Sequence, residues 1–177
     1  MAYLLAYFTA KGKNMGSPIN YDVDGWRGLY VRKDNQIIEA PQEDVLVAKA
    51  YQEWRDKGPL IDGRRLTIMA KKRAYHVNEE VRIIHVVEAP LPGYKIYVMG
   101  PKRIFNEYVN GHLQREAMSL DQTNPFSPAD YDGRVLDSPA IDYNFEITTY
   151  SFADPGVYQI CWQPGQWKSN LLEIEVL

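Results

Sequence analysis

Alternation of apolar and polar residues with a period of two is the feature that most constrains this fold. Leu66, Ile68 and Ala70 occupy every second position, and residues 141–147 repeat the pattern with four large apolar side chains. Side chains of a strand point alternately to opposite faces, so this rhythm predicts strands with one face toward a core. Turn-forming residues separate about seven such segments, as is typical of an antiparallel sandwich.

Short turns join the expected strands. Asn110-Gly111 stands between apolar segments at 104–109 and 112–117 and is the strongest two-residue hairpin signal in the chain. Asp34-Asn35 predicts a second hairpin. After the strand at 141–147, the alternation changes phase at Thr148-Thr149, which predicts a bulge or a change of neighbouring strand there. Further strands are expected at 2–9, 28–31, 36–39, 81–87, 94–98, 157–162 and 172–176.

One helix is expected, over residues 43–57. Glu43 and Asp44 favour the positive end of a helix dipole, and Gly58-Pro59 is typical of a helix end. Apolar residues at a spacing of four form a stripe that should face the core. The stripe consists of Leu46, Val47, Ala50, Tyr51 and Trp54.

These elements predict a mainly β protein with two parts. Residues 1–63 would form an N-terminal extension with a β-hairpin and the helix, packed on the core. Residues 64–177 have the size of one β-sandwich domain.

The second part resembles bacterial immunoglobulin-like β-sandwich domains. Tyr75-His76-Val77-Asn78-Glu79-Glu80-Val81 resembles the polar turn that opens a second strand, and Asp154-Pro155-Gly156-Val157-Tyr158 resembles the turn that opens the penultimate strand. The resemblance implies an immunoglobulin-like sandwich in which the Tyr158 hydroxyl bonds to upstream backbone. Cys161 has no partner cysteine, so the kinship would be with disulfide-free members. Such members serve mostly as adhesion, substrate-binding or inhibitor modules. The resemblance therefore implies no catalytic residue in this chain.

Composition excludes several classes of protein. The 177 residues are 45% hydrophobic and 24% charged, which argues against disorder. A single cysteine excludes an internal disulfide framework, and no apolar run reaches the roughly 20 residues of a membrane helix. The net charge of −3 gives no case for nucleic-acid binding. Residues 1–10 are apolar without a basic leader, so we expect a buried strand there and a cytoplasmic protein.

The segment 118–140 is the strongest candidate for function. It has no clear period, and it carries three prolines with the aromatic residues Phe126 and Tyr131. Long irregular loops in small domains are usually functional, although such a loop can also simply pack over the mouth of a sandwich. We expect this segment and the turn at 163–167 to lie at the same end of the sandwich and to form a binding surface. The chain is therefore predicted to be a non-catalytic module that binds a protein partner. The expected binding residues are Phe126, Tyr131, Trp162 and Trp167.

Two alternatives stay open. Trp26, Trp162 and Trp167 could stack on sugar rings, which would make the chain a carbohydrate-binding module. Alternatively, a small metal-dependent enzyme could use an acidic cluster of Asp130, Asp132 and Asp137 to hold Ca²⁺, although Asp-Gly pairs also simply favour turns. Otherwise no cofactor is expected, and whether the chain is an enzyme is left open.

Overall fold

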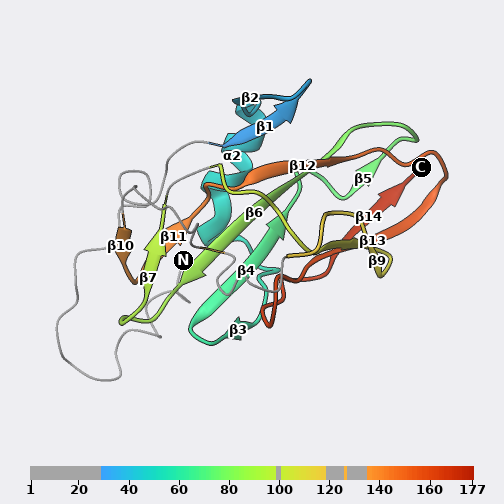
Figure 1. The fold of residues 1–177 in the computed structure, drawn as a ribbon. Coiled ribbons are helices and arrows are strands. Elements are labelled where there is room, and N and C mark those ends of the chain that lie inside the picture. The colour runs from blue at the N-terminus through green and yellow to red at the C-terminus, as the bar shows by residue number, and fades with distance from the viewer. Residues whose placement is uncertain (1–28, 99–100, 119–125, 127–134) are drawn as a thin grey trace.

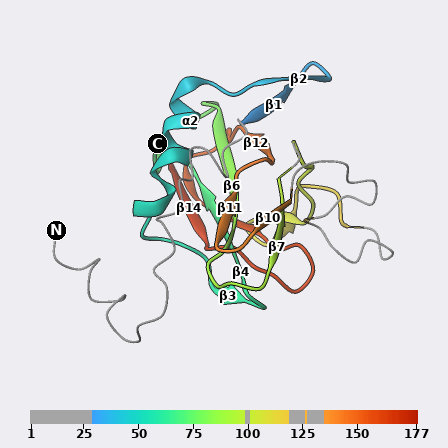
Figure 2. The same cartoon turned by 90° about the vertical axis from the view of Figure 1, so that its left-hand side faces the viewer.

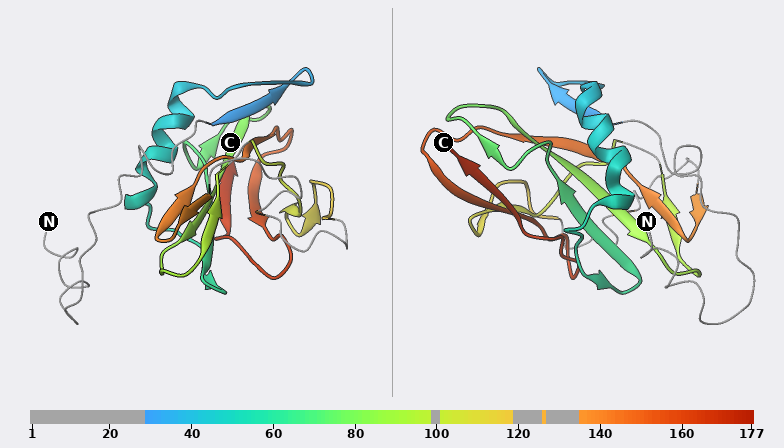
Figure 3. Two further views of the ribbon diagram at one scale, coloured as in Figure 1. Left: turned by 60° about the vertical axis from the view of Figure 1, so that its left-hand side comes forward. Right: turned by 180° about the vertical axis from the view of Figure 1, so that it is seen from behind.

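In the part of the chain that the structure describes, two large β-sheets pack on each other and one helix lies outside them (Figure 1). The structure, a computed structural model, describes residues 29–98, 101–118, 126 and 135–177. Seen from behind, the helix lies across the face of the larger sheet (Figure 3, right). In the described part of the chain, no helix has the length and apolarity needed to cross a membrane.

The larger sheet has seven strands in the order β2-β1-β12-β6-β4-β3, with β11 also paired to β6. The smaller sheet has the order β5-β14-β13-β8-β9, and β7 and β10 form a separate pair. Most pairs are antiparallel, but β1 runs parallel to β12 and β5 parallel to β14. The strands are β1 Tyr30–Lys33, β2 Gln36–Glu39, β3 Leu60–Ile61, β4 Arg64–Met69, β5 Ala74–Tyr75, β6 Val81–Ala89, β7 Lys95–Tyr97, β8 Glu107–Val109, β9 His112–Leu113, β10 Val135–Asp137, β11 Ala140–Asp142, β12 Glu146–Tyr150, β13 Gly156–Trp162 and β14 Leu172–Val176.

Strand β6 has apolar partners on both faces. Ile83 and Val87 lie in the core between the two sheets, whereas Ile84 and Val86 lie in a second core under the helix. A strand covered on both faces is typically rich in β-branched apolar residues on both faces, and five of the seven residues at 81–87 are Val or Ile. The mainly β class predicted from alternation is therefore confirmed.

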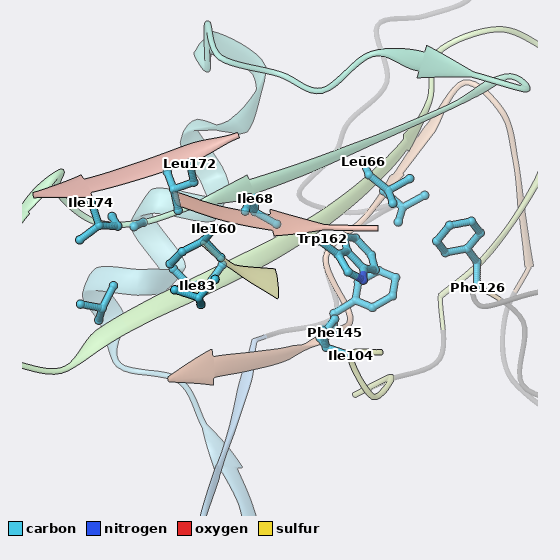
Figure 4. Packing of buried hydrophobic residues seen from close by; sticks show 14 of the residues in the cluster. Leu66, Ile68, Ile83, Ile104, Phe126, Phe145, Ile160, Trp162, Leu172 and Ile174 are labelled. Atoms are coloured by element: carbon cyan, nitrogen blue, oxygen red, sulfur yellow. The ribbon is translucent and has the colours of Figure 1, made fainter. Parts of the chain in front are cut away.

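The core between the sheets is centred on aromatic and branched side chains from both layers (Figure 4). Trp162 from β13 packs edge-to-face on Phe145, with ring centroids 5.3 Å apart. Ile160 and Leu172 come from the smaller sheet, and Ile68 faces them from β4. Fully burying each such aliphatic side chain contributes roughly 1.5–3 kcal/mol, so this shared core is the main stabilising feature of the sandwich.

The helix is shorter than predicted, and it is rotated. An α-helix α2 spans Gln42–Lys49 and continues as a 3₁₀ turn η1 over Ala50–Glu53, so it ends before residue 57. The expected stripe is wrong in part: Leu46 is 59% exposed and Ala50 is exposed, whereas Ala48 and Tyr51 are buried. Asp44 occupies the same buried side, because Arg82 of β6 pairs with its carboxylate.

Two hairpins form where the turn residues predicted them. Asp34 and Asn35 both have positive φ (49° and 63°), as a type I′ turn requires, and Asn110-Gly111 turns in the same way between β8 and β9. The expected strand at 141–147 is wrong, because residues 143–145 divide it into β11 and β12. The change of neighbour predicted at Thr148-Thr149 is confirmed: residues 146–147 of β12 pair with β1, whereas residues 148–150 pair with β6.

The N-terminal part shares a sheet with the sandwich. The parallel pairing of β1 with β12 joins the β1–β2 hairpin to the larger sheet, and this hairpin projects at one margin of the molecule (Figure 2). The predicted strand at 2–9 lies outside the described residues, and the boundary at residue 63 stays a prediction.

Candidate functional site

One end of the sandwich gathers the residues predicted to bind a partner. We call it the loop end: strand β4 begins there at Arg64, β13 ends there at Trp162, and the turn that carries Trp167 follows. Between residues 118 and 135, the structure describes Phe126 alone. The geometry around Phe126 therefore shows where the middle of the long segment is attached.

Phe126 is an anchor, because its side chain is only 4% exposed. Its ring centroid lies 5.1 Å from that of Trp167 and 6.3 Å from that of Trp162, both at steep edge-to-face angles. The guanidinium of Arg64 lies 5.9 Å from the Phe126 ring and 5.6 Å from that of Tyr94. Edge-to-face pairs stabilise by about 0.5–1.5 kcal/mol beyond area burial, so Phe126 holds the segment to the core.

The turn after β13 forms the other wall. The Trp167 indole N–H donates to the Ile61 carbonyl at 3.1 Å, which ties the turn to β3. Gly165 has a φ of 62°, and a Cβ there would lie 3.8 Å from both Met118 Cε and the Trp167 ring. The turn and the long segment are therefore in contact through Trp167 and Phe126, and the Met118 side chain lies near Gly165.

Both ends of the long segment are fastened by hydrogen bonds. At the start, the Met118 N–H donates to Asn106 Oδ1 at 2.9 Å. At the end, the Tyr94 N–H donates to Ser138 Oγ at 2.8 Å, and the Ser138 N–H donates to the Tyr94 carbonyl at 3.0 Å. Leu136 of β10 is buried as well. The segment is thus held at its start, middle and end.

The predicted binding residues differ in exposure. Trp162 is 2% exposed and donates its indole N–H to the Phe105 carbonyl at 3.1 Å, so the expectation that it offers a ring face to a sugar is wrong. Phe126 is buried beside it, and Trp167 is half-buried. Tyr131 lies outside the described residues. Of this set, Trp167 has accessible ring surface in the described part of the chain.

Of the predicted acidic cluster, the structure describes Asp137 alone. The Asp137 side chain is 80% exposed and pairs with Lys95 Nζ at 2.5 Å. Asp130 and Asp132 lie outside the described residues. No group of three or more His, Cys, Asp or Glu side chains suited to a metal occurs among the residues that are described.

Sequence reasoning missed a polar cluster inside the sandwich. His85 of β6 lies 2.7 Å through Nε2 from Glu107 Oε1 of β8, and both side chains are fully buried. The Tyr150 hydroxyl donates to the other carboxylate oxygen. Burial alone would raise the pKa of Glu107, but His85 and the Tyr150 hydrogen bond hold it below its usual value. Glu107 is therefore an ionised carboxylate that bridges the two sheets.

A second buried cluster lies at the break between β11 and β12. Lys102 Nζ is 2.8 Å from Asp142 Oδ2, and the two side chains are 5% and 2% exposed. Asn144 donates to Asp142 Oδ1 from its backbone N–H and its side-chain amide, both at 2.9 Å. These bonds hold residues 142–144 in a tight turn, which explains why the alternation predicted there does not continue as one strand.

A polar cavity of about 240 Å³ lies at the opposite end of β4 and β6. Arg82 lies in its wall and donates to Asp44, Glu43 and Glu80. Burial raises the pKa of Asp44, whereas hydrogen bonds to Lys71 and Arg82 lower that of Glu43. The cavity is lined by Glu43, Asp44, Lys71, Lys72, Tyr75, Glu79, Glu80 and Arg82. Its charges pair with one another, so the loop end remains the stronger candidate.

Comparison with known proteins gives no further lead. No protein-family model, no curated protein and no solved structure matches this chain. A fold does not by itself specify a function, which depends on the residues of the site.

Proposed function

We propose that this protein is a non-catalytic module with an immunoglobulin-like sandwich that recognises a protein partner through residues 118–140. The observation that carries the proposal is the anchoring of Phe126 between Trp162 and Trp167. Anchors at Met118, Phe126 and Ser138 divide the segment into short spans between fixed points. Short tethered spans lose less conformational entropy when they bind, which favours recognition by a pre-organised loop.

The finer parts of the proposal have separate support. The Tyr158 hydroxyl donates to the Asp154 carbonyl at 3.0 Å, the kind of corner that the immunoglobulin-like resemblance implies. The proposal includes a cytoplasmic location, with which the buried, unpaired thiol of Cys161 is compatible.

A loop replacement tests the proposal. Residues 127–134 are replaced by a Gly/Ser sequence of equal length, which keeps Phe126 and all of β10. Deleting the whole segment would be a poor test, because it would also remove Leu136 from the core. The wild type and the variant are compared by quantitative mass spectrometry of the proteins they retain from a cell extract. Each retained protein is then purified and titrated.

The matched control replaces Asn110-Gly111 by another two-residue turn, Asp-Gly, at a different hairpin. We expect the loop replacement to weaken binding of one purified partner at least tenfold, with the control unchanged and the melting temperature preserved. Equal affinity of all three proteins for every purified partner contradicts the proposal. Binding of a sugar by the wild type, lost in Trp167→Ala, would support the carbohydrate alternative instead.

A further inference from the structure

The outer edge of β2 differs from the other sheet edges in the described residues. At the remaining ends of the two large sheets, β3, β5 and β9 are each only two residues long. Among the described strands, β7, β10 and β11 also pair on one side only, and each has three residues. Strand β2 has four residues, and all four are exposed. Proteins usually blunt such edges with very short strands, lysine, proline or a bulge, but the sequence of β2 is Gln-Ile-Ile-Glu.

Hairpin geometry identifies which backbone groups face outward. A two-residue type I′ turn makes the flanking pair, Lys33 and Gln36, a hydrogen-bonded pair, and the bonds then alternate along the strand. Gln36 and Ile38 therefore bond to β1, and the Ala40 N–H continues this series by donating to the Leu29 carbonyl at 2.9 Å. The N–H and C=O groups of Ile37 and Glu39 consequently point away from β1, free to pair with another strand.

The side chains show which strand would fit. Ile38 lies directly opposite Val31, and Val31 packs on the core under the helix. Side chains of cross-strand partners lie on the same face of the sheet. Val31 and Ile38 therefore form an apolar row that leads from the core to Ile38, which is 42% exposed. A partner strand should continue the row with an apolar residue opposite Ile38.

We propose that β2 pairs antiparallel with β2 of a second copy of this chain, about a two-fold axis through Ile38. With outward groups on Ile37 and Glu39, hydrogen bonds form between Ile37 of one copy and Glu39 of the other. Ile38 then lies opposite Ile38 of the other copy, and the row becomes Val31, Ile38, Ile38 and Val31. A register that places Ile37 of one copy opposite Ile38 of the other is excluded. The backbone groups of Ile37 point toward the partner strand, whereas those of Ile38 point back to β1, so the two residues could not form hydrogen bonds.

The expected dimer is weak. A four-residue strand pair buries far less than the roughly 1,000 Å² of a stable interface, so dimerisation should depend on protein concentration in the micromolar range or above. The joined sheets would place two loop ends on one particle, which would raise the avidity for a repetitive partner if the proposed function holds.

Cysteine cross-linking tests the register. In this arrangement Ile38 forms a non-hydrogen-bonded pair with its copy, at a Cα separation of about 4.5 Å, which lies within disulfide range. Ile37 lies on the other face and is offset from its own copy by two positions. We expect Ile38→Cys to give several-fold more disulfide-linked dimer than Ile37→Cys under mild oxidation. The wild type is the background control, because its single cysteine, Cys161, is buried.

Sedimentation of the uncross-linked protein tests the surface itself. Ile38→Lys should raise the dimer dissociation constant by at least about tenfold, since it opposes two ammonium groups. Val157→Lys, at a strand position that is 60% exposed, should leave it unchanged, and both variants should melt like the wild type.

If the protein is monomeric at all concentrations, the proposal is wrong, whether the edge of β2 is then exposed to solvent or covered by another segment of the same chain. A dimer that Ile38→Lys leaves intact overturns it as well. Equal cross-linking of Ile37→Cys and Ile38→Cys would show that the register is wrong. None of these results depends on the loop end, so the proposed function is tested independently.

Discussion

At the scale of single residues, the most constrained positions are those where the backbone leaves no room or where a charge is enclosed. A Cβ on Gly58 would lie 2.0 Å from the Leu66 carbonyl oxygen and 2.8 Å from the Asn170 backbone nitrogen. Glu107 is enclosed between the sheets with His85 and Tyr150. Both positions depend on contacts between segments distant in the sequence.

We expect Gly58→Ala to destabilise the protein by about 2 kcal/mol, because the added methyl group meets backbone that cannot rotate away. Gly93→Ala is the matched comparison. A Cβ on Gly93 would lie in open space, but the residue has a φ of 101°, so this substitution should lower the free energy of unfolding by about 1 kcal/mol through backbone strain alone. Urea denaturation of both variants measures the difference. Equal loss of stability would contradict the close approach at Gly58.

The buried carboxylate should make stability depend on pH. The pKa of Glu107 is lower in the folded protein than in the unfolded chain, so its stabilising contribution is complete above the unfolded value of about 4.3. The contribution is lost as pH falls from there through the folded pKa. Glu107→Gln should cost about 3 kcal/mol at pH 7, and the difference from the wild type should shrink below pH 4. Urea denaturation across pH 3–7 checks this, and a constant difference would refute it.

At the scale of elements, the helix shows how a tertiary contact overrides a local pattern. The spacing of Leu46 and Trp54 favours one face, but the ion pair between Asp44 and Arg82 turns another face toward the sheet. Ala48 and Tyr51 pack there, and the Tyr51 hydroxyl donates to Glu88 at 2.9 Å. No rule of amphipathic patterning would place an aspartate on the buried side of a helix.

Lysine substitution at two neighbouring helix positions distinguishes the faces. Leu46→Lys should change the free energy of unfolding by less than about 0.5 kcal/mol, because that side chain is 59% exposed. Ala48→Lys should cost at least about 3 kcal/mol, since it places a charge in a core that is fully closed. Thermal and urea unfolding would measure both. The reverse order would mean that the face predicted from the sequence is the buried one.

At the scale of the whole molecule, the larger sheet separates two apolar cores and carries a projecting hairpin (Figure 3). Strand β6 touches both cores, whereas β2 is exposed along its whole length. Local stability should therefore fall from β6 toward β2 across the same sheet.

Hydrogen exchange should reveal this gradient. Amides of β6 should exchange only through global unfolding, with the highest protection in the protein. The inward-facing amides of Gln36 and Ile38 should exchange through local opening of the hairpin, orders of magnitude faster. At high protein concentration, the outward amides of Ile37 and Glu39 should gain protection if β2 pairs with a second copy. Uniform protection across the sheet would show that the hairpin unfolds with the core.

The amino-acid sequence by itself determined the local features: the alternation that makes a strand of β4, the β-branched run that makes a strand of β6, and the turn residues at Asn35 and Asn110 that need positive φ. These follow from neighbouring residues, so they could be read without the fold. Only the tertiary structure decided what covers each face. A period of two separates two faces but does not say whether water, a sheet or a helix lies against them, which is why Trp162 was expected at a binding surface and is found in the core. Partners far apart in the chain, such as Arg82 for Asp44 and His85 for Glu107, make it possible to bury charges that would otherwise stay in water.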